Sequence, residues 1–540
     1  MSLSTLDKAD QDPARGPRHA AKPADRKVPW GRGHPWLTLV AVALGVMMVG
    51  LDGTVVAIAN PAIATDLHAD LSGLQWVTNG YLLALAVSLI TAGKIADRFG
   101  RKKIFLAGIA GFAIASLGVG LSGSIGQVIF WRVVQGFAGA MLQPAGLAIL
   151  RNTFPLDKLN MAIGIWGGTS ALAIAAGPIV GGLFVQHINW ESVFYLNVPL
   201  GAIALLVGLW VIRDSRDTGA AGAFDVPGVV LLSGSLFSLV WGLIKAQSHG
   251  FGDPLPVGFF LAAVVVGALF VWRESRAEHP LLPLGLFRSA SLSAAVALVT
   301  LVLFAMFGAL FFLTLYLQRV HGLSPVDTGV RLLPMTLAFV VSSPVAGAVT
   351  SRIGPRVPLV TGMLMTALAM FGLSRLGVDS AYLGLWPWFV LLGLSIGVVI
   401  VAGTEAIVGN APAHLAGVAG GLQQTAMQVG GVLGTSVLGT IMTSRVGSVL
   451  VDRLTGAGLD SSSAAKLSGA KEYVAQGVAP VPKGTPEPAA HAITSGSHLA
   501  FMDGFHTSLV IGAVVALVAA GVALLVRRGE RPAEGAVVAV

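Results

Sequence analysis

The stretch GKIADRFGRKK, Gly93 to Lys103, decides how this sequence folds. It joins two apolar segments and carries two glycines, one aspartate and five basic residues. In multi-pass membrane proteins, lysine and arginine gather in the short loops that face the cytoplasm. The stretch therefore predicts two membrane helices joined by a tight, basic cytoplasmic loop, which we call the signature loop.

The composition of the whole chain also indicates a membrane protein. Of its 540 residues, 54% are hydrophobic and only 11% are charged, with a mean hydropathy of +0.79. Soluble domains carry about 25% charged residues, whereas a bilayer accepts this much apolar surface. The net charge of +8 is spread over short loops, so we expect no nucleic-acid partner. The absence of cysteine excludes disulfides and thiolate metal sites.

Fourteen apolar segments follow one another, each near or above the ~20 residues that a membrane helix needs. They cover residues 37–60, 75–94, 103–122, 127–150, 160–186, 193–213, 226–246, 254–272, 290–317, 328–350, 357–375, 385–404, 416–444 and 504–526. With an even number of spans, both termini lie on one side, and 24 of the 34 Lys and Arg residues fall on that side. The charge bias therefore predicts that both termini are cytoplasmic.

An internal repeat predicts how these spans are grouped. Residues 93–101, GKIADRFGR, align with residues 347–355, GAVTSRIGP, through two glycines and an arginine, each time at the end of the second helix of a six-helix group. Repeated halves around a central site are common in transporters. The predicted organisation is a disordered basic cytoplasmic tail (1–34), a six-helix bundle (35–215), two inserted transmembrane helices with flanking loops (216–288), a second six-helix bundle (289–527) with an extracellular loop (446–503), and a cytoplasmic tail (528–540). We expect a short helix near residues 461–476 of that loop.

Two charged residues lie inside apolar segments, where an ionised side chain is costly unless it has a partner, water or a function. Asp52 belongs to LDGTVVAIANPAI and Arg132 opens RVVQGFAGA. Counted from the nearer ends of their spans, the two residues lie ~12 Å and ~9 Å deep, so their depths are similar. The hypothesis is a proton-sensitive ion pair between them. The alternatives are a solvated Asp52 near the surface and a static structural pair.

A glycine-proline motif, AAGPIVGG, lies in the fifth span. Gly177 and Gly181 form a face of small residues that lets helices approach closely, and Pro178 frees a backbone carbonyl. Ordinary helix packing explains these residues equally well. Glu405 is a further acidic residue at the cytoplasmic end of the twelfth span, where it is either a proton or substrate group or a solvated helix end.

Together these motifs resemble the fourteen-span drug:proton antiporter branch of the major facilitator superfamily, and within it the antibiotic-resistance exporters of actinomycetes. The resemblance implies an all-α polytopic membrane protein with the major facilitator fold, in which two six-helix bundles and two extra helices give 14 transmembrane helices. It also implies a proton-coupled antiporter that exports a small amphipathic drug or antibiotic across a bacterial cytoplasmic membrane and confers resistance. The glycine-proline motif marks antiporters in this family, which favours export over uptake. A proton-coupled importer and a non-transporting receptor or scaffold are the alternatives.

The resemblance assigns roles to individual residues. Proton coupling would involve Asp52, Arg132 and Glu405. Conformational gating would involve Gly93, Asp97, Arg98, Gly100, Arg101, Gly177, Pro178 and Gly181. In the signature loop, Asp97 would pair with Arg98 or Arg101 or cap a helix, and Gly93 would pack against a helix of the other half.

The expected partners are a small hydrophobic molecule, protons and the lipid bilayer. The substrate is expected to be neutral or weakly acidic, because Glu405 is the one clear acid inside the second half. We expect no cofactor, no metal and no enzymatic activity, with the proton gradient as the energy source, because the sequence has no Walker A motif. A monomer is the default for this family.

Overall fold

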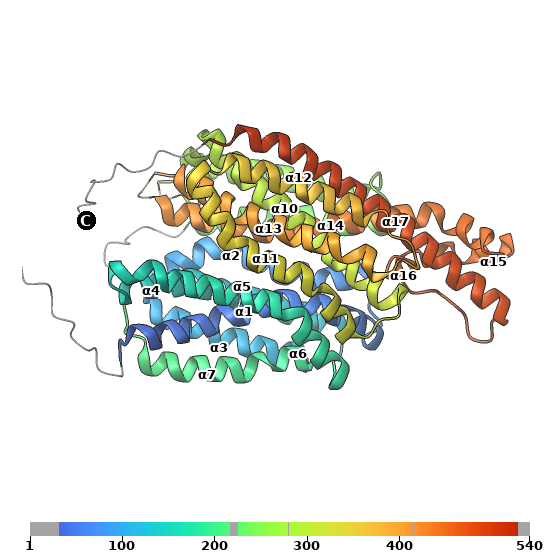
Figure 1. Ribbon diagram of the computed structural model, residues 1–540, viewed down its shortest axis with the longest axis horizontal. Helices are drawn as coiled ribbons and strands as arrows, with labels where there is room; N and C mark the ends of the chain where they lie inside the picture. Colours follow the sequence, from blue (N-terminus) through green and yellow to red (C-terminus); the bar gives the residue numbers. More distant parts are fainter. Residues whose placement is uncertain (1–31, 216–224, 279, 413–414, 528–540) are drawn as a thin grey trace, which may run out of the picture.

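The structure is a computed structural model that describes residues 32–215, 225–278, 280–412 and 415–527. Long helices run side by side along one axis, and these residues contain no β-strand (Figure 1). The predicted tail 528–540 lies outside the described residues, as does the predicted tail 1–34 up to residue 31. Beyond that point, Gly33 donates a backbone hydrogen bond to Val211 O at 2.7 Å.

The helices follow the order that the apolar segments predict. The first group is α1 Pro35–Asp66, α2 Leu71–Phe99, α3 Arg101–Gly120, α4 Ile125–Thr153, α5 Leu156–His187, α6 Ser192–Tyr195 and α7 Asn197–Val211. Two helices come next, α8 Val226–His249 and α9 Pro254–Arg276, with a short 3-10 turn, η1 Leu284–Arg288. The last group is α10 Ala290–Leu315, the π-helical turn η2 Tyr316–Val320, α11 Pro325–Ile353, α12 Arg356–Leu373, α13 Tyr382–Gly409, α14 Ala416–Gly456, α15 Ser461–Lys466, η4 Ser468–Ala470, α16 Lys471–Val474, α17 Glu487–Val522 and η5 Ala523–Leu525.

Within the described residues, thirteen helices are long and apolar enough to cross a membrane. A fourteenth span is α2, when its two segments, Leu71–Leu89 and Thr91–Phe99, are counted together across a bend of 54°. Large apolar side chains such as Leu261 and Val264 on α9 are exposed on the outside of the bundle, where lipid would surround them. The chain is therefore a multi-pass, all-α membrane protein with the predicted fold class.

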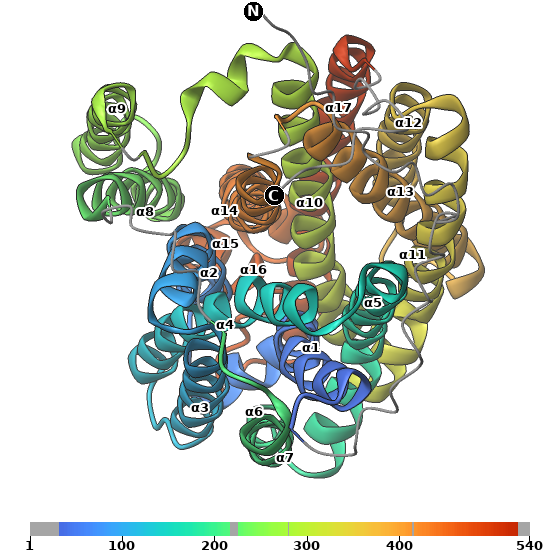
Figure 2. The same cartoon turned by 90° about the vertical axis from the view of Figure 1, so that its left-hand side faces the viewer.

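The helices pack in two groups with a pair beside them. Helices α1 to α5 and α7 pack mainly on one another, and α10 to α14 pack with α17. Figure 2 shows α8 and α9 as a separate pair at one side of the bundle. The two groups meet where α5 packs on α11 and α2 packs on α14. We call these groups the first half and the second half.

The two halves repeat the same local geometry at the end of their second helix. Gly100 follows α2 with φ 111°, and Gly354 follows α11 with φ 84°. Residues other than glycine rarely adopt such values, so both turns need glycine. Since α2 and α11 are the second helices of their halves, the sequence repeat corresponds to a structural repeat.

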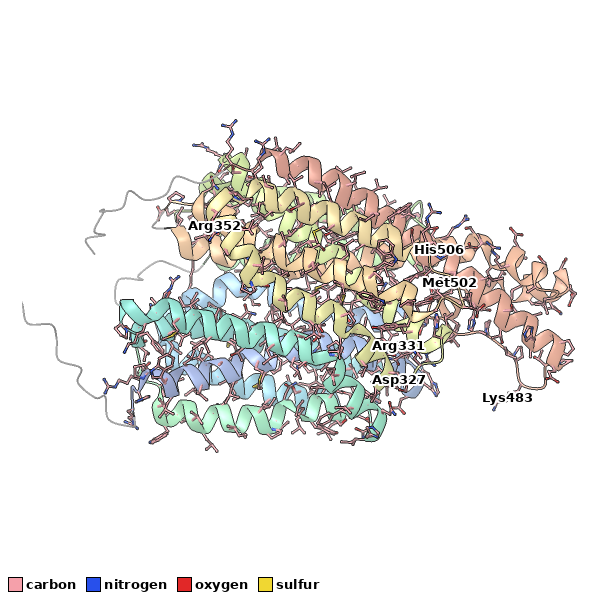
Figure 3. All side chains as sticks on the ribbon, viewed as in Figure 1. Asp327, Arg331, Arg352, Lys483, Met502 and His506 are labelled. Atoms are coloured by element: carbon pink, nitrogen blue, oxygen red, sulfur yellow. The ribbon has the colours of Figure 1, made fainter. Side chains whose placement is uncertain are left out.

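Several contacts between the halves lie at the end of the bundle opposite the signature loop. Gln318 Nε2 donates to Ile58 O at 3.2 Å, and Arg319 donates to Pro61 O and Thr65 Oγ1. Val326 N donates to the side chain of Gln186 at 3.1 Å. Figure 3 shows the charged residues of α11 at its two ends, with Arg352 at the signature-loop end. These contacts hold the two halves together at the opposite end.

The loop predicted at 446–503 is largely helical. Helix α14 continues to Gly456 and α17 starts at Glu487, so the connection between them is residues 457–486. A short helix is present in it, as predicted, in α15 and α16. The spans were drawn from apolarity, which marks the part of a helix inside lipid, whereas the helix itself continues into water.

The extended parts of α14 and α17 stand out beyond the rest of the bundle (Figure 1). They are joined by a bidentate ion pair in which Arg453 donates to both Asp503 oxygens, at 2.6 and 2.9 Å. They also pack closely, because a Cβ at Gly496 would lie 2.9 Å from Arg453 O. The protruding segment is thus a braced helical pair.

Candidate functional site

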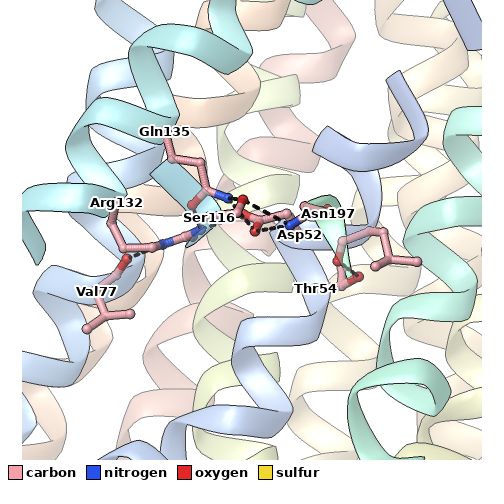
Figure 4. A network of polar contacts seen from close by, with 8 residues as sticks. Asp52, Thr54, Val77, Ser116, Arg132, Gln135 and Asn197 are labelled. Carbon is pink, nitrogen blue, oxygen red and sulfur yellow. Dashed lines mark hydrogen bonds and ion pairs between the residues drawn. The ribbon is translucent and has the colours of Figure 1, made fainter. Parts of the chain in front are cut away.

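A buried ion pair joins the two charged residues that the sequence singled out (Figure 4). Arg132 Nη1 lies 2.5 Å from Asp52 Oδ2, and the side chains are 1% and 2% exposed. Asp52 comes from α1 and Arg132 from α4. The prediction that the two residues lie at similar depth and meet is confirmed, and a solvated Asp52 is excluded in this conformation.

Three neutral polar residues complete the network around Asp52. Gln135 Nε2 donates to Asp52 Oδ1 at 2.8 Å and to Ser116 Oγ at 2.7 Å. Asn197, the first residue of α7, donates to Asp52 Oδ1 at 3.4 Å and to Ser116 Oγ at 3.2 Å. Helices α1, α3, α4 and α7 thus each contribute a polar side chain to one buried cluster.

Two nitrogens of the Arg132 guanidinium group, Nε and Nη1, are held by hydrogen bonds. Nε donates to Val77 O at 3.0 Å, and Nη1 also donates to Gln135 Oε1 at 2.7 Å. The ring of Tyr81 faces the guanidinium, with its centroid 4.2 Å from Cζ. A buried ion pair is tolerated when its remaining donors and acceptors are also bonded. Both Asp52 oxygens and two of the three Arg132 nitrogens meet that condition.

The same arginine also lines a pocket between the halves. The pocket is lined by Gly53, Val56, Ala57, Asn60, Thr78, Tyr81, Leu82, Arg132, Phe307, Leu310, Phe311 and Thr435. Among the described residues, the Tyr81 hydroxyl and Asn60 Oδ1 are buried without a hydrogen-bond partner. A largely apolar pocket with a few convergent polar groups is typical of a small-molecule site.

The glycine-proline motif lies at the contact of α5 with α1 and α11. A Cβ at Gly177 would overlap Thr54 Oγ1, and a Cβ at Gly181 would lie 3.2 Å from Val55 O. Pro178 faces α11, because its carbonyl group occupies the space that a side chain at Gly329 would need. The motif therefore packs the first half internally and also touches the second half.

A second, apolar pocket lies beside this motif. Its lining includes Thr54, Pro178 and Leu310, and Leu310 also lines the pocket at Arg132. The remaining lining residues are Ile174, Met306, Met335, Thr336, Phe339 and Ile396. The two pockets thus meet α10 near Leu310, between the two halves.

The signature loop forms one of its predicted contacts, and another differs. Asp97 pairs with Arg101, whose Nε lies 2.8 Å from Oδ1, while Arg98 lies against the ring of Phe99. Gly93 does not meet the other half, because the nearest atom to a Cβ there is Pro144 Cβ of α4, at 3.5 Å. The halves are joined at the opposite end, so at this end Gly93 packs within its own half.

Glu405 lies apart from the ion pair. It is exposed near the end of α13, and no hydrogen bond or ion pair joins it to another described residue. The structure thus brings Asp52 and Arg132 together but leaves Glu405 outside their network.

Sequence reasoning missed the neutral members of the network. Gln135, Ser116, Asn197 and Tyr81 carry no formal charge, so their presence in an apolar segment was not conspicuous. One signal was available for Gln135, which follows Arg132 by three residues and so shares its helix face.

Comparisons with known proteins agree with the fold. Residues 42–435 match the family model described as Major Facilitator Superfamily. The chain is 59% identical over 410 residues to the tetracenomycin C resistance and export protein of Streptomyces glaucescens, covering 76% of each protein. It is 37% identical over 412 residues to the puromycin resistance protein pur8 of Streptomyces alboniger, covering 75% of this chain and 81% of that protein.

Solved structures resemble the chain in fold. A bacterial homolog of the human lysosomal transporter Spinster, in an inward-facing and unoccupied conformation, matches with a TM-score of 0.57 and 17% identity, covering 91% of this chain and 98% of that one. A POT family transporter in complex with 5-aminolevulinic acid matches with a TM-score of 0.56 and 13% identity, covering 90% of this chain and 95% of that one. At these identities the likeness concerns the arrangement of the helices alone.

Proposed function

The chain belongs to the Major Facilitator Superfamily and is a membrane transport protein rather than an enzyme, and from this premise we propose that it exports a small hydrophobic antibiotic in exchange for protons. The export direction and the substrate class are supported by the names of the relatives, which are resistance and export proteins. In producing or exposed bacteria, such a transporter confers resistance.

The observation that carries the proposal is that Arg132 belongs to two sites at once. It pairs with Asp52 inside the first half, and it lines the pocket between the halves. Protonation of Asp52 removes the charge that holds Arg132, so Arg132 becomes free to interact with a molecule in the pocket. A substrate bound there in turn favours release of Arg132 from Asp52, which couples substrate binding to proton binding.

The pocket supports a neutral or weakly acidic hydrophobic substrate. Phe307, Phe311 and Leu310 offer apolar and aromatic contact surface, while Tyr81 and Asn60 offer unpartnered polar atoms. An arginine is the one charged residue in its lining, which disfavours a cationic substrate. The proton gradient supplies the energy, and no cofactor takes part.

The proposed orientation puts both termini and the signature loop in the cytoplasm of a bacterial cell, in the cytoplasmic membrane. It is supported by the excess of Lys and Arg on that side. The contacts through Gln318 and Arg319 then close the outer end, and the substrate enters from the cytoplasm. The transporter works as a monomer by rocking the two halves about the central pocket.

The gating residues act at the two ends of this movement. Gly177, Pro178 and Gly181 let α5 slide against α1 and α11 at the outer end. At the inner end, Gly93, Asp97, Arg98, Gly100 and Arg101 form the turn that meets the second half once the inner end closes. The proposal rests on Asp52 and Arg132 for proton coupling, with Glu405 as a solvated helix end.

The experiment is a growth assay in a bacterial host that lacks its main efflux pumps. The host expresses the wild type, Asp52→Asn or Glu405→Gln at matched membrane levels, against a panel of antibiotics and dyes. We expect resistance to some compounds that Asp52→Asn abolishes and Glu405→Gln retains. Efflux of a radiolabelled compound from energised cells then gives the direction. Accumulation instead of efflux would show a proton-coupled importer and overturn the proposal.

A further inference from the structure

Two carboxyl groups lie buried together between α8 and α9, outside the site described above. Asp225 immediately precedes α8 and is 5% exposed, and Glu274 lies in the last turn of α9 and is 3% exposed. Both are at the signature-loop end of the bundle. Acidic residues are almost never buried this fully without a partner for each oxygen, so their bonding needs an explanation.

Each carboxyl group uses only one of its two oxygens. Asp225 Oδ1 accepts from Gly228 N at 3.1 Å and pairs with Arg273 Nη2 at 3.1 Å. Glu274 Oε2 accepts from Leu282 N at 2.9 Å. The other oxygens, Asp225 Oδ2 and Glu274 Oε1, are buried and have no hydrogen-bond partner among the residues that the structure describes.

These two unpartnered oxygens face the same point in space. A Cβ built at Gly228 would lie 2.5 Å from Asp225 Oδ2 and 2.5 Å from Glu274 Oε1, so the oxygens are separated by at most twice 2.5 Å. Glycine at this position leaves that space open. Two carboxylates offer acceptors only, and a proton on one of them converts it into a donor for the other.

Two cations lie near the pair, but neither donates a hydrogen bond to the two unpartnered oxygens. Arg273, on α9 itself, pairs with Asp225, but its side chain is 35% exposed. From α2, the neighbouring charge is Lys94, whose Nζ is bonded to Pro280 O at 3.1 Å. Like charges this close in a buried site cannot both remain ionised without a strong penalty.

We propose that Asp225 and Glu274 bind one proton between Oδ2 and Oε1, which makes the base of the α8–α9 pair a proton-binding site separate from Asp52 and Arg132. The proton is taken from water at the signature-loop end and forms an O–H bond on one carboxyl group, which donates to the other carboxylate. Its release leaves two carboxylates and returns the proton to water.

The site is connected to the signature loop through a short strap, residues 280–282. Leu282 N is held by Glu274, and Pro280 O is held by Lys94, the second residue of the signature loop. Loss of the proton adds a negative charge that attracts Lys94 and competes with Pro280 O for its ammonium group. Proton occupancy therefore sets how firmly α8 and α9 are attached to the loop.

The test is infrared spectroscopy of the full-length protein in lipid nanodiscs, on the C=O stretch of protonated carboxyl groups. An Asp52→Asn background removes the Asp52 carboxyl group from the signal. At neutral pH we expect a protonated-carboxyl band that disappears in Glu274→Gln and in Asp225→Asn and also on raising the pH. Glu278→Gln, which removes an exposed acid four residues beyond Glu274, should leave the band unchanged.

A second measurement uses only the wild-type protein, so it does not depend on whether a variant folds. Dicyclohexylcarbodiimide is a hydrophobic reagent that modifies protonated carboxyl groups, and mass spectrometry of the wild type should find it on Asp225 or Glu274 at neutral pH, with less modification at alkaline pH. A band unaffected by both substitutions, or no modification of either residue, would overturn the proposal. Stabilisation by Na⁺ or Mg²⁺ that Glu274→Gln abolishes would also overturn it, since a cation would then bridge two carboxylates. None of these outcomes depends on drug export, so failure of the proposed function would be seen separately.

Discussion

Thr54 Oγ1 occupies the space that a side chain at Gly177 would need, so α1 and α5 can pack as they do only with glycine at this position. Thr54 is itself fixed, because its hydroxyl donates to Ile174 O at 3.1 Å. The glycine-proline motif is thus tied to the helix that carries Asp52. One residue, Gly53, separates Thr54 from Asp52 along α1, so movement of α5 would act close to the ion pair.

Gly177→Ala should therefore destabilise the protein. Overpacking a close contact costs about 1 to 3 kcal/mol. Thermal unfolding of the purified protein should show this loss, and resistance in the growth assay should fall with it. Gly168→Ala on the same helix is the matched control, because a Cβ there meets no atom within 4 Å. Equal unfolding temperatures for the two variants would contradict the close contact.

Breaking the Asp52–Arg132 pair should be costly, and removing both charges less so. Asp52→Asn or Arg132→Leu leaves one buried charge unpaired, which costs about 3 to 5 kcal/mol. The double variant Asp52→Asn/Arg132→Leu should recover much of that stability, as measured by thermal unfolding. Transport should remain absent in all three variants, because proton exchange needs the carboxyl group. Resistance restored in the double variant would mean that the pair is only structural.

Arg319→Ala should open the end of the bundle that Arg319 closes. Hydrogen bonds to charged groups contribute about 1.5 to 3 kcal/mol, so the open population should rise about tenfold or more. The native chain has no cysteine, so Leu310→Cys provides a single thiol between the halves. A membrane-impermeant maleimide added outside cells should label this thiol faster when Arg319 is replaced.

The control for that measurement is Arg331→Ala. Arg331 lies at the same end, but its guanidinium group stacks on Tyr382 within the second half, 5.4 Å from the ring centroid. Its removal should leave the labelling rate unchanged. Faster labelling in both variants would indicate general loosening rather than release of the contact between the halves.

His321 should make the protein less stable in acid. Burial lowers the pKa of His321 below its usual value, and the nearby Arg331 lowers this pKa further. The unfolded chain then binds this proton more readily than the folded protein does. The contribution of His321 to stability is therefore full above about pH 6.5 and falls as the pH drops below that value.

His321→Phe should remove this part of the pH dependence. The variant keeps a ring against Tyr316, whose centroid lies 4.6 Å from that of the imidazole. Between neutral and mildly acidic pH, the unfolding temperature of the variant should fall less than that of the wild type. His187→Phe, which removes an exposed imidazole, serves as the comparison. Identical pH profiles for wild type and His321→Phe would refute the prediction.

The sequence was most informative at positions where only a few residue types or partners are physically possible. Asp52 and Arg132 were predicted to meet because each is charged inside an apolar span, and a buried charge needs a partner. Gly100 and Gly354 align in the sequence repeat, and both are glycine because each has a positive φ. In contrast, Gln135 and Asn197 are neutral, and their role depends on burial that only packing reveals.

Other differences arise because apolarity in a sequence marks the part of a helix that lies in lipid, and it does not mark where the helix itself ends. The ends of α14 and α17 were missed because a helix in water can be polar. The prediction that Gly93 packs against the other half was wrong, because the residues around Gly93 depend on which end of the bundle is closed. The opposed oxygens of Asp225 and Glu274 were invisible, since 49 positions separate the two residues and α8 and α9 must pack before they meet.

The braced extension of α14 and α17 has a practical consequence for imaging. With 41 residues, α14 is ~60 Å long, about twice the thickness of the hydrocarbon core. Most transporters of this size have little protein outside the detergent micelle, so electron microscopy has few features by which to orient the particles. Here a stiff helical pair, closed by Arg453 and Asp503, provides such a landmark and a fixed epitope for an antibody fragment.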